Sequence, residues 1–494
     1  MTKATDIKVH QVLTEVLKKI TPSEREQMET RVFIEKVLEI TDHILKPYGF
    51  SRTLAGSYMR DTWLPNKKEF DIFIMFPEDH SREKLEKTGL EIGKKITKAL
   101  NGECVIAYAE HPYVRAKVYT KPVIEEVKRL LRKKKVSMGT SYDIDIVPCY
   151  AVESAEKIKS AVDRTPFHNK WLSENLSHAL APQVRLLKQF AKGIGVYGSD
   201  TRVLGMSGYL CELLTVQYKS FKNFLDHASK WEAGQVFIDL EEHRKEDKEH
   251  ALKDLKGQPL IVIDPVDPKR NVASSFSPEN FARLVASSRT FLEKPGERFF
   301  FPERQKVSTK ELRKILDSRG TRVLGVRFKR PDVIDDVLWP QLRRTSRRLA
   351  DILKEHEFIV MGRDSWADQK SCILLFEMEV WSLPRIRKLI GPFVFSKQHS
   401  DEFITKYQKT GRIWVEGQNW VAEISRKFMQ AEEKLKDSLK DSEKGLKAKG
   451  IASSPAKSIA GKFEILKPQD ILKFAKGNPG LAEFLKSYFG KRVV

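Results

Sequence analysis

A chain of 494 residues exceeds the size at which a single hydrophobic core keeps growing, so the sequence predicts two to four domains. Hydrophobic residues make up 40% of the chain and charged residues 32%, which excludes a disordered protein and is typical of a soluble globular one. The 89 Lys and Arg residues outnumber the 67 Asp and Glu residues, and the net charge of +22 predicts an acidic partner such as a polyphosphate backbone.

An anionic membrane is the alternative acidic partner, but the sequence shows no feature that would target the protein to a membrane. Residues 1–6 carry neither a signal peptide nor a myristoylation site, and no apolar run approaches the length of a membrane span. The cysteines lack CxxC spacing, which predicts reduced thiols rather than a zinc site or a disulfide framework. They are Cys104, Cys149, Cys211 and Cys372. We therefore expect a cytoplasmic protein without a membrane partner.

The first predicted domain, residues 1–155, alternates helices and strands. Thr21, Pro22 and Ser23 predict the start of a helix whose apolar positions continue at helical spacing to about residue 45. A turn-rich stretch at 54–57 follows this helix. Runs of β-branched and aromatic residues then predict four strands, at 70–76, 105–108, 113–119 and 142–148. A basic run at 128–135 precedes the last of them.

The second predicted domain, residues 156–268, is mostly helical. In one of its helices an apolar stripe through Leu187 faces the core, while Arg185, Lys188 and Lys192 share a separate basic face. Without further context, that basic face would be a solvated one. The run at 264–268 contains two prolines and predicts a stiff, turn-forming hinge at the end of the domain.

The third predicted region, residues 269–494, mixes strands and charged helices, so the whole chain is expected to have an α+β multidomain fold. Its predicted strands are at 322–328, 372–376 and 412–415. The segment 427–449 is dense in Lys and Glu and predicts a solvated helix. Four arginines at helical spacing predict either a basic face suited to a duplex RNA backbone or an exposed helix with ion pairs. They are Arg343, Arg344, Arg347 and Arg348.

Acidic residues on two predicted strands supply the first chemical signal. Glu69 and Asp71 are two residues apart, so both carboxylates point to one face of their strand. Asp143 and Asp145 share a face of a second strand in the same way, and periodicity does not choose between them. Three such carboxylates can hold two Mg²⁺ ions, which activate an attacking hydroxyl and stabilise a leaving pyrophosphate. An acidic pair on an exposed strand is the alternative.

Gly56 and Ser57 lie shortly before the first acidic pair. A glycine at this place permits close backbone approach, and the serine hydroxyl and the backbone amides can bind triphosphate oxygens. An ordinary Gly-Ser turn is the alternative interpretation. The pattern therefore predicts a phosphate-binding turn beside the carboxylates, provided that the two segments meet in the fold.

Together these segments resemble the archaeal (class I) CCA-adding enzymes, which are tRNA nucleotidyltransferases of the DNA polymerase beta superfamily. The resemblance begins with Gly-Ser-Tyr-Met-Arg at 56–60, the acidic pair at 69 and 71, and Ile-Asp-Ile-Val-Pro-Cys-Tyr at 144–150. Later stretches at 163–168, 184–188, 193–198, 207–212 and 268–273 add to it. It covers roughly residues 50 to 275, and the match beyond residue 276 is loose.

The resemblance implies a polymerase-beta-like N-terminal domain and a role for each matched residue. Asp145 becomes the third metal ligand beside Glu69 and Asp71, and Asp143 the second choice. Ser57 and Arg60 would contact the triphosphate, and Arg270, whose planar fork suits a base edge or a phosphate, would contact nucleotide and primer end. The implied nucleotide-binding residues are Ser57, Arg60, Thr165, His168, Lys188, Tyr197 and Arg270.

The resemblance also implies the reaction, namely addition of C, C and A to the tRNA 3′ end from CTP and ATP without a template. Residues 1–155 would catalyse it, 156–268 would complete the nucleotide pocket, and 269–494 would bind tRNA. A poly(A) polymerase or an oligoadenylate synthetase would use the same carboxylates, and a non-catalytic RNA-binding protein on a degenerate transferase fold is the third alternative. The sequence leaves open whether the protein forms a homodimer.

Overall fold

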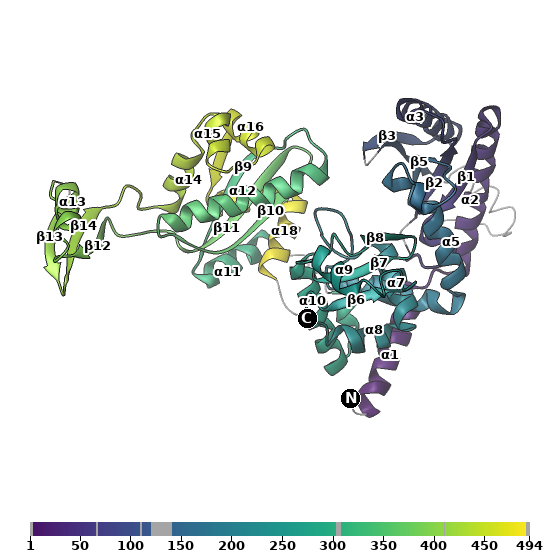
Figure 1. Cartoon of the computed structure of the whole chain (residues 1–494), viewed down its shortest axis with the longest axis horizontal. Helices are drawn as coiled ribbons and strands as arrows, with labels where there is room; N and C mark the ends of the chain where they lie inside the picture. The colour runs from purple at the N-terminus through teal and green to yellow at the C-terminus, as the bar shows by residue number, and fades with distance from the viewer. Residues whose placement is uncertain are drawn as a thin grey trace. The chain divides into compact units, whose positions relative to one another are not determined.

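The computed structural model describes residues 3–65, 68–108, 111–119, 141–302, 308–409 and 411–490. By its internal contacts the chain divides into two compact units, residues 1–303 and 304–492, and each is described by itself. Figure 1 shows the helices and the separate sheets that make up the fold, and the predicted α+β multidomain class is confirmed. The basic run predicted at 128–135 lies outside the described residues.

A five-stranded sheet in the order β1-β2-β5-β4-β3 forms the first part of the first unit. Its strands are β1 (Ser51–Ala55), β2 (Glu69–Phe76), β3 (Glu103–Tyr108), β4 (Pro112–Tyr119) and β5 (Ser141–Tyr150). β2 and β5 run parallel, whereas the other neighbouring pairs are antiparallel. All four predicted strands are confirmed. β1 was not predicted, because five residues ending in a glycine turn are too few to display a clear alternation.

Two helices, α2 (Glu24–Leu45) and α3 (Arg82–Ala99), contribute to the core under one face of this sheet. The predicted helix start is wrong by a few residues, because Ser23 is the N-cap and its hydroxyl accepts the Glu26 N–H at 3.2 Å. Alternate residues such as Ile72 and Ile144 point into this core. The residues between them therefore point to the opposite face, which these helices do not cover.

The rest of the first unit is mostly helical, as predicted, with one small sheet in the order β6-β7-β8. Its helices are α1 (Lys3–Ile20), α5 (Thr165–Asn175), α6 (Ala181–Gly193), α7 (Gly208–Tyr218), α8 (Phe221–Ala228), α9 (Lys248–Asp254) and α10 (Pro278–Glu293). Its strands are β6 (Val236–Asp239), β7 (Leu260–Asp264) and β8 (Asp267–Asn271). Short 3-10 turns are η1 (Lys46–Tyr48), η2 (Ser57–Arg60), η3 (Ala155–Lys157), η4 (Ala161–Arg164), η5 (His178–Leu180) and η6 (Glu297–Phe299).

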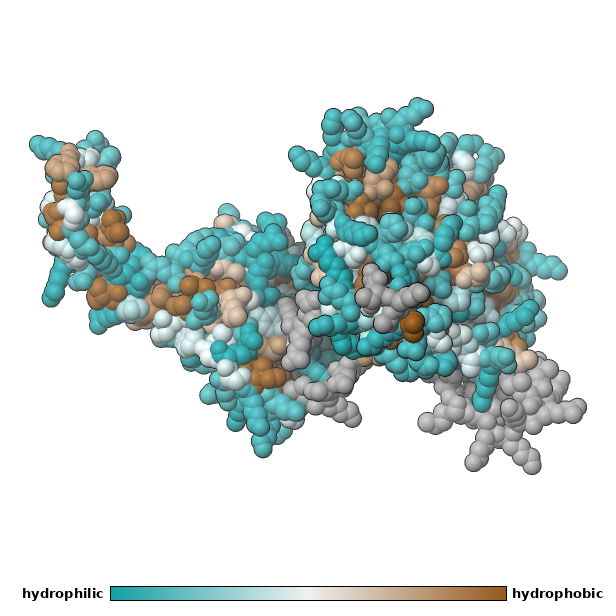
Figure 2. All heavy atoms as spheres, turned by 90° about the horizontal axis from the view of Figure 1, so that it is seen from below, coloured by the Kyte–Doolittle hydropathy of each residue, from teal (hydrophilic) through white to brown (hydrophobic). Residues whose placement is uncertain are grey.

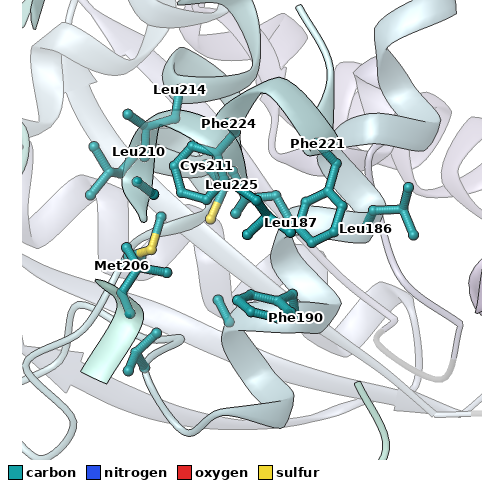
Figure 3. Close-up of a cluster of buried hydrophobic side chains, with 14 of the residues drawn as sticks. Leu186, Leu187, Phe190, Met206, Leu210, Cys211, Leu214, Phe221, Phe224 and Leu225 are labelled. Carbon is teal, nitrogen blue, oxygen red and sulfur yellow. The ribbon is translucent and has the colours of Figure 1, made fainter. Parts of the chain in front are cut away.

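The core of this helical part lies around α6, α7 and α8, and Figure 3 shows Leu187, Phe190 and Cys211 among its packed side chains. The apolar stripe predicted through Leu187 is confirmed, because it is fully buried. The basic face beside it is only partly solvated. Arg185 and Lys188 are buried there, and each has a carboxylate partner: Lys188 pairs with the buried Glu212, and Arg185 pairs with the more exposed Asp61.

The stiff turn predicted at 264–268 is confirmed, but it lies inside the first compact unit and not at its end. Asp264 ends β7, Pro265 and Val266 form the turn and Asp267 begins β8, and Asp264 and Pro265 are buried. The Asp264 carboxylate accepts the backbone N–H of Val266 at 3.1 Å and three side-chain donors besides. A turn held by so many bonds to one buried carboxylate is rigid, and prolines in sequence cannot distinguish it from a hinge.

The second unit contains a four-stranded sheet in the order β10-β11-β9-β15 and a three-stranded sheet in the order β12-β14-β13. The strands are β9 (Arg322–Lys329), β10 (Ile359–Ala367), β11 (Ser371–Val380), β12 (Ile386–Phe393), β13 (Gly411–Glu416), β14 (Asn419–Ser425) and β15 (Phe463–Leu466). The helices are α11 (Thr309–Arg319), α12 (Asp335–Glu355), α13 (Lys397–Tyr407), α14 (Ala431–Leu439), α15 (Glu443–Ala448), α16 (Ser453–Gly461), α17 (Pro468–Lys476) and α18 (Pro479–Phe489). The three predicted strands are confirmed as parts of β9, β11 and β13.

The single solvated helix predicted at 427–449 is wrong. The segment holds two helices, α14 and α15, and its widely spaced apolar residues Leu435, Leu439 and Leu446 are buried in the core of the unit. The arginine cluster lies on α12, with Arg344 and Arg347 exposed. The face of the molecule drawn in Figure 2 is mostly hydrophilic. Among the described residues, the helices are all too short or too polar to cross a membrane.

Candidate active site

Four carboxylates lie on the face of the five-stranded sheet opposite α2 and α3. The parallel register of β2 and β5 pairs Glu69 with Asp143 and Asp71 with Asp145. The two residues on each strand are two positions apart, and the paired residues of neighbouring strands point to the same side of a sheet. All four side chains therefore point to one face. The structure therefore brings the three predicted metal ligands onto two neighbouring strands, with the second-choice ligand Asp143 beside them.

The carboxylate of Asp145 is held by an arginine on the adjacent strand β4. Arg115 donates from Nε and Nη2 to the two oxygens of Asp145, both at 2.8 Å, and Nη2 also donates to the Tyr113 hydroxyl at 2.8 Å. The hydrogen bonds with Asp145 raise the pKa of Arg115. Burial and the Asp145 charge raise the pKa of Tyr113 to about 12, so the phenol stays neutral. The carboxylate of Asp145 is thus held in one orientation by Arg115.

The donor set fits a hard divalent cation in its chemistry, because carboxylate oxygens on adjacent strands are the ligands that Mg²⁺ prefers. Within the described residues, however, no group of three or more Asp, Glu, His or Cys side chains is already gathered around one metal position. Both oxygens of Asp145 are engaged by Arg115. A cation at Asp145 therefore requires this ion pair to open or to share an oxygen with the cation.

The predicted phosphate-binding turn meets the carboxylates, as the sequence required. Ala55 at the end of β1 pairs with Asp71, and the chain then turns through Gly56 into η2, which spans Ser57 to Arg60. Gly56 has φ 104° and ψ 178°, a conformation that is almost confined to glycine. Ser57 therefore lies two residues after Ala55, the residue that pairs with Asp71.

Arg60 and Lys188 come together on one buried carboxylate, Glu212 of α7. Arg60 donates to Glu212 at 2.9 Å, and the Lys188 ammonium donates to it at 3.0 Å. The Thr62 hydroxyl donates to the same carboxylate at 2.5 Å. Burial by itself would raise the pKa of Glu212, but the neighbouring cations outweigh burial and lower it. This network joins the sheet part to the helical part of the unit.

His168 and Arg270 meet on a second buried carboxylate, Asp264. His168 Nε2 lies 2.9 Å from it, Arg270 donates to it at 2.5 Å, and the Tyr209 hydroxyl donates at 3.2 Å. Burial opposes ionisation of Asp264, but bonds from His168 and Arg270 hold its pKa below the usual range. The Arg270 side chain keeps 37% of its surface exposed, so part of its fork stays accessible.

The last two predicted residues are close to these networks. Thr165 begins α5 and lies three residues before His168, so the two share a helix face. Tyr197 forms a bridge with Met206, and a side-chain carbon built on Gly208 would lie 3.3 Å from the Tyr197 hydroxyl and 3.7 Å from the Lys188 ammonium. Burial raises the pKa of Tyr197, which keeps its hydroxyl neutral.

Sequence reasoning missed three charged residues that hold the predicted ones, namely Arg115, Glu212 and Asp264. Glu212 left a signal, because it is the one acidic residue in the apolar run of α7, and a carboxylate in a buried helix needs a cationic partner. Asp264 was assigned to a hinge. Arg115 left no signal, since its pairing depends on the register of β4 and β5.

Three family models match successive parts of the chain. A nucleotidyltransferase domain matches residues 34–168, the second domain of tRNA nucleotidyltransferases matches 182–301, and the C-terminal domain of CCA-adding enzymes matches 319–467. The first match contains the carboxylate face, and the second contains Lys188, Glu212 and Asp264.

Curated relatives match over most of their length. A CCA-adding enzyme of Archaeoglobus fulgidus is 37% identical over 86% of this chain and 89% of its own. Those of Methanocaldococcus jannaschii and Methanosarcina acetivorans are 37% and 34% identical, over 87% and 96% of this chain and 90% and 97% of their own. A solved structure of Cid1, an RNA terminal uridylyl transferase, is similar at a TM-score of 0.43 and 14% identity, covering 61% of this chain and 99% of its own. That likeness is too low to add to the argument.

Proposed function

The chain belongs to the family of CCA-adding enzymes, and we propose that it completes the 3′ end of tRNA on the carboxylate face of its five-stranded sheet. It is a tRNA nucleotidyltransferase that adds C, C and A. Its relatives do not favour the alternative functions, which are a poly(A) polymerase, an oligoadenylate synthetase and a non-catalytic RNA-binding protein. CTP and ATP would be the nucleotide substrates and pyrophosphate the second product.

Glu69, Asp71 and Asp145 would hold two Mg²⁺ ions. Bound Mg²⁺ would promote ionisation of the tRNA 3′ hydroxyl and stabilise the charge on the departing pyrophosphate. The observation that carries this assignment is the register that sets Asp145 directly beside Asp71 on parallel strands. Asp145 is favoured over Asp143 because it lies beside Asp71 and is only partly exposed, whereas Asp143 lies beside Glu69 and is exposed.

The nucleotide would be held by side chains from both parts of the first unit. Ser57 and Arg60 would bind the triphosphate beside the carboxylates, and Lys188 would balance its charge. Tyr197 would offer its ring to a base or sugar. The exposed part of the Arg270 fork would read a base edge or a phosphate. Thr165 and His168 would complete this pocket.

We assign a role to each predicted region of the chain. Residues 1–155 would carry the chemistry, residues 156–268 would complete the nucleotide pocket, and residues 269–494 would bind tRNA. The exposed arginines Arg344 and Arg347 are candidates for contact with an RNA backbone. We also propose that the protein works in the cytoplasm.

The test uses a tRNA that lacks its three terminal nucleotides, with CTP alone, ATP alone, or both. Two C additions with CTP and one further A with both nucleotides would support the function, whereas a long A tail from ATP alone would contradict it. Asp71→Ala and Asp145→Ala should abolish incorporation while tRNA binding persists. Asp143→Ala is the matched control, because it removes a carboxylate from the same face. Normal turnover by the Asp145 variant together with an inactive Asp143 variant would exchange the two assignments.

A further inference from the structure

Glu212 belongs to none of the roles assigned above, yet it is the centre of a buried polar network in the first unit. Its residue surface is 1% exposed. Its carboxylate accepts hydrogen bonds from Arg60, Thr62 and Lys188. Arg60 and Thr62 come from the turn beside the metal-binding face, whereas Lys188 comes from α6. One carboxylate therefore fixes two proposed phosphate-binding cations that are distant in sequence.

The geometry leaves both cations little freedom. The Lys188 ammonium has three N–H donors, and they meet Glu212 at 3.0 Å, the Thr62 hydroxyl at 3.1 Å and the Thr62 carbonyl at 3.2 Å. The Arg60 fork donates to Glu212 and to Asn169, both at 2.9 Å. A flexible lysine and a flexible arginine are thus held in one arrangement before any ligand arrives.

The charges of the network do not cancel. Arg60 and Lys188 supply two positive charges and Glu212 one negative charge, all at positions with little exposure to water. A buried excess of one positive charge is unfavourable until an anion approaches. In the described structure the Arg60 Nε is buried and has no hydrogen-bond partner. Glu212 therefore balances only one of the two positive charges, and the cluster still attracts an anionic ligand.

The helix that carries Glu212 is itself well supported. Leu210, Cys211 and Leu214 of α7 pack into the core that Figure 3 shows, together with Leu187 of the helix that carries Lys188. Glu212 therefore stands on a rigid element, which is what precise placement of a binding group requires. An exposed carboxylate on a loop would give no such control.

Resting on the proposed function, we propose that Glu212 is a positioning residue that fixes the Arg60 guanidinium and the Lys188 charge beside the triphosphate of the incoming nucleotide. Its carboxylate contacts neither substrate nor metal. It holds the Arg60 guanidinium and the Lys188 ammonium in fixed positions, so that neither side chain has to rearrange when the nucleotide binds. Glu212 thereby acts equally on CTP and ATP, because both carry the same triphosphate.

The test is Glu212→Gln, which keeps the shape of the side chain and removes its charge. We expect KM for CTP and for ATP to rise roughly 10- to 100-fold with kcat changed much less, because a charged hydrogen-bond partner is lost. Inorganic tripolyphosphate, used as a competitive inhibitor, should weaken by a similar factor, while tRNA binding should be unchanged. A KM that stays the same or falls would overturn the proposal, since removal of a negative charge tightens triphosphate binding if the cations keep their places.

Leu214→Ala is the control for general damage, because it opens the core under the same helix without touching the polar network. It should lower Tm and leave KM near its wild-type value, and an equal rise of KM in both variants would overturn the proposal. If the Glu212 variant does not fold, Thr62→Val removes the hydroxyl bond to the carboxylate more gently and should raise KM by roughly 3- to 10-fold. An unchanged KM there would also overturn it. A wild-type protein that adds no CCA would refute the proposed function instead.

Discussion

Replacing Gly56 by alanine tests whether the turn before Ser57 is a functional constraint. Gly56 has φ 104° and ψ 178°, where a residue with a side chain is strained by about 1–3 kcal/mol. The added carbon would lie 3.5 Å from the Asp71 carboxylate, an ordinary contact distance, so the penalty comes from the backbone and not from a clash. The chain can relieve this strain only by turning the peptide that leads into Ser57.

A strain of about 1–3 kcal/mol corresponds to a factor of roughly 5 to 150 between the native and the relaxed turn. We expect Gly56→Ala to lower kcat/KM for CTP incorporation into tRNA by a factor in this range, chiefly through KM. Gly49→Ala is the matched control, because Gly49 also has a positive φ of 67° but lies before the other end of β1. It should lower Tm to a similar extent and leave kcat/KM unchanged. Equal kcat/KM values in both variants would refute the reasoning.

Two further predictions concern charged pairs. Arg115→Ala frees both oxygens of Asp145, so the Mg²⁺ concentration for half-maximal incorporation should fall. The decrease should be at most roughly fivefold, because the Arg115 side chain is 51% exposed and its ion pair is therefore weak. An increase would show instead that Arg115 orients Asp145 for the metal. Burial alone would raise the pKa of Glu377, but hydrogen bonds from Arg319 and Thr321 lower it below the ordinary value of about 4.3. The ionised carboxylate therefore stabilises the second unit at pH values above about 4.3. Glu377→Gln should therefore lower Tm at pH 7, and the difference from wild type should shrink as the pH falls below about 4. A pH-independent difference in thermal denaturation would contradict this.

The strands that carry the carboxylates were predictable because their signal is local. Runs of β-branched and aromatic residues mark β2 and β5, and the alternation of acidic and apolar residues at the start of each strand fixes which carboxylates share a face, whatever the strands pair with. The same reasoning predicted the buried stripe of α6 through Leu187. Period-2 and period-3.6 patterns therefore gave these strands and this helix, with their buried faces, correctly.

Properties that depend on contacts between distant segments were not predictable in this way. Two prolines near Asp264 suggested a hinge at the end of a domain, but the turn lies inside the first compact unit, where four hydrogen bonds to its buried carboxylate hold it. Leu435, Leu439 and Leu446 are too sparse to indicate a core, yet the surrounding sheet and helices bury them. The register of β2 and β5, which pairs Asp145 with Asp71 and Asp143 with Glu69, is likewise a property of two strands together.

The positive charges of the protein fall into two classes that do different work. Exposed cations such as Arg344 and Arg347 add to a net charge of +22, which attracts an anion of any shape and weakens with salt. The cations of the proposed nucleotide pocket are instead tied to buried carboxylates, Arg60 to Glu212 and Arg270 to Asp264. Such pairs lose most of their long-range attraction but keep their donors in fixed directions. Net charge could therefore indicate an anionic partner from composition alone, whereas in the proposed pocket the choice of a triphosphate would depend on carboxylates that do not touch it.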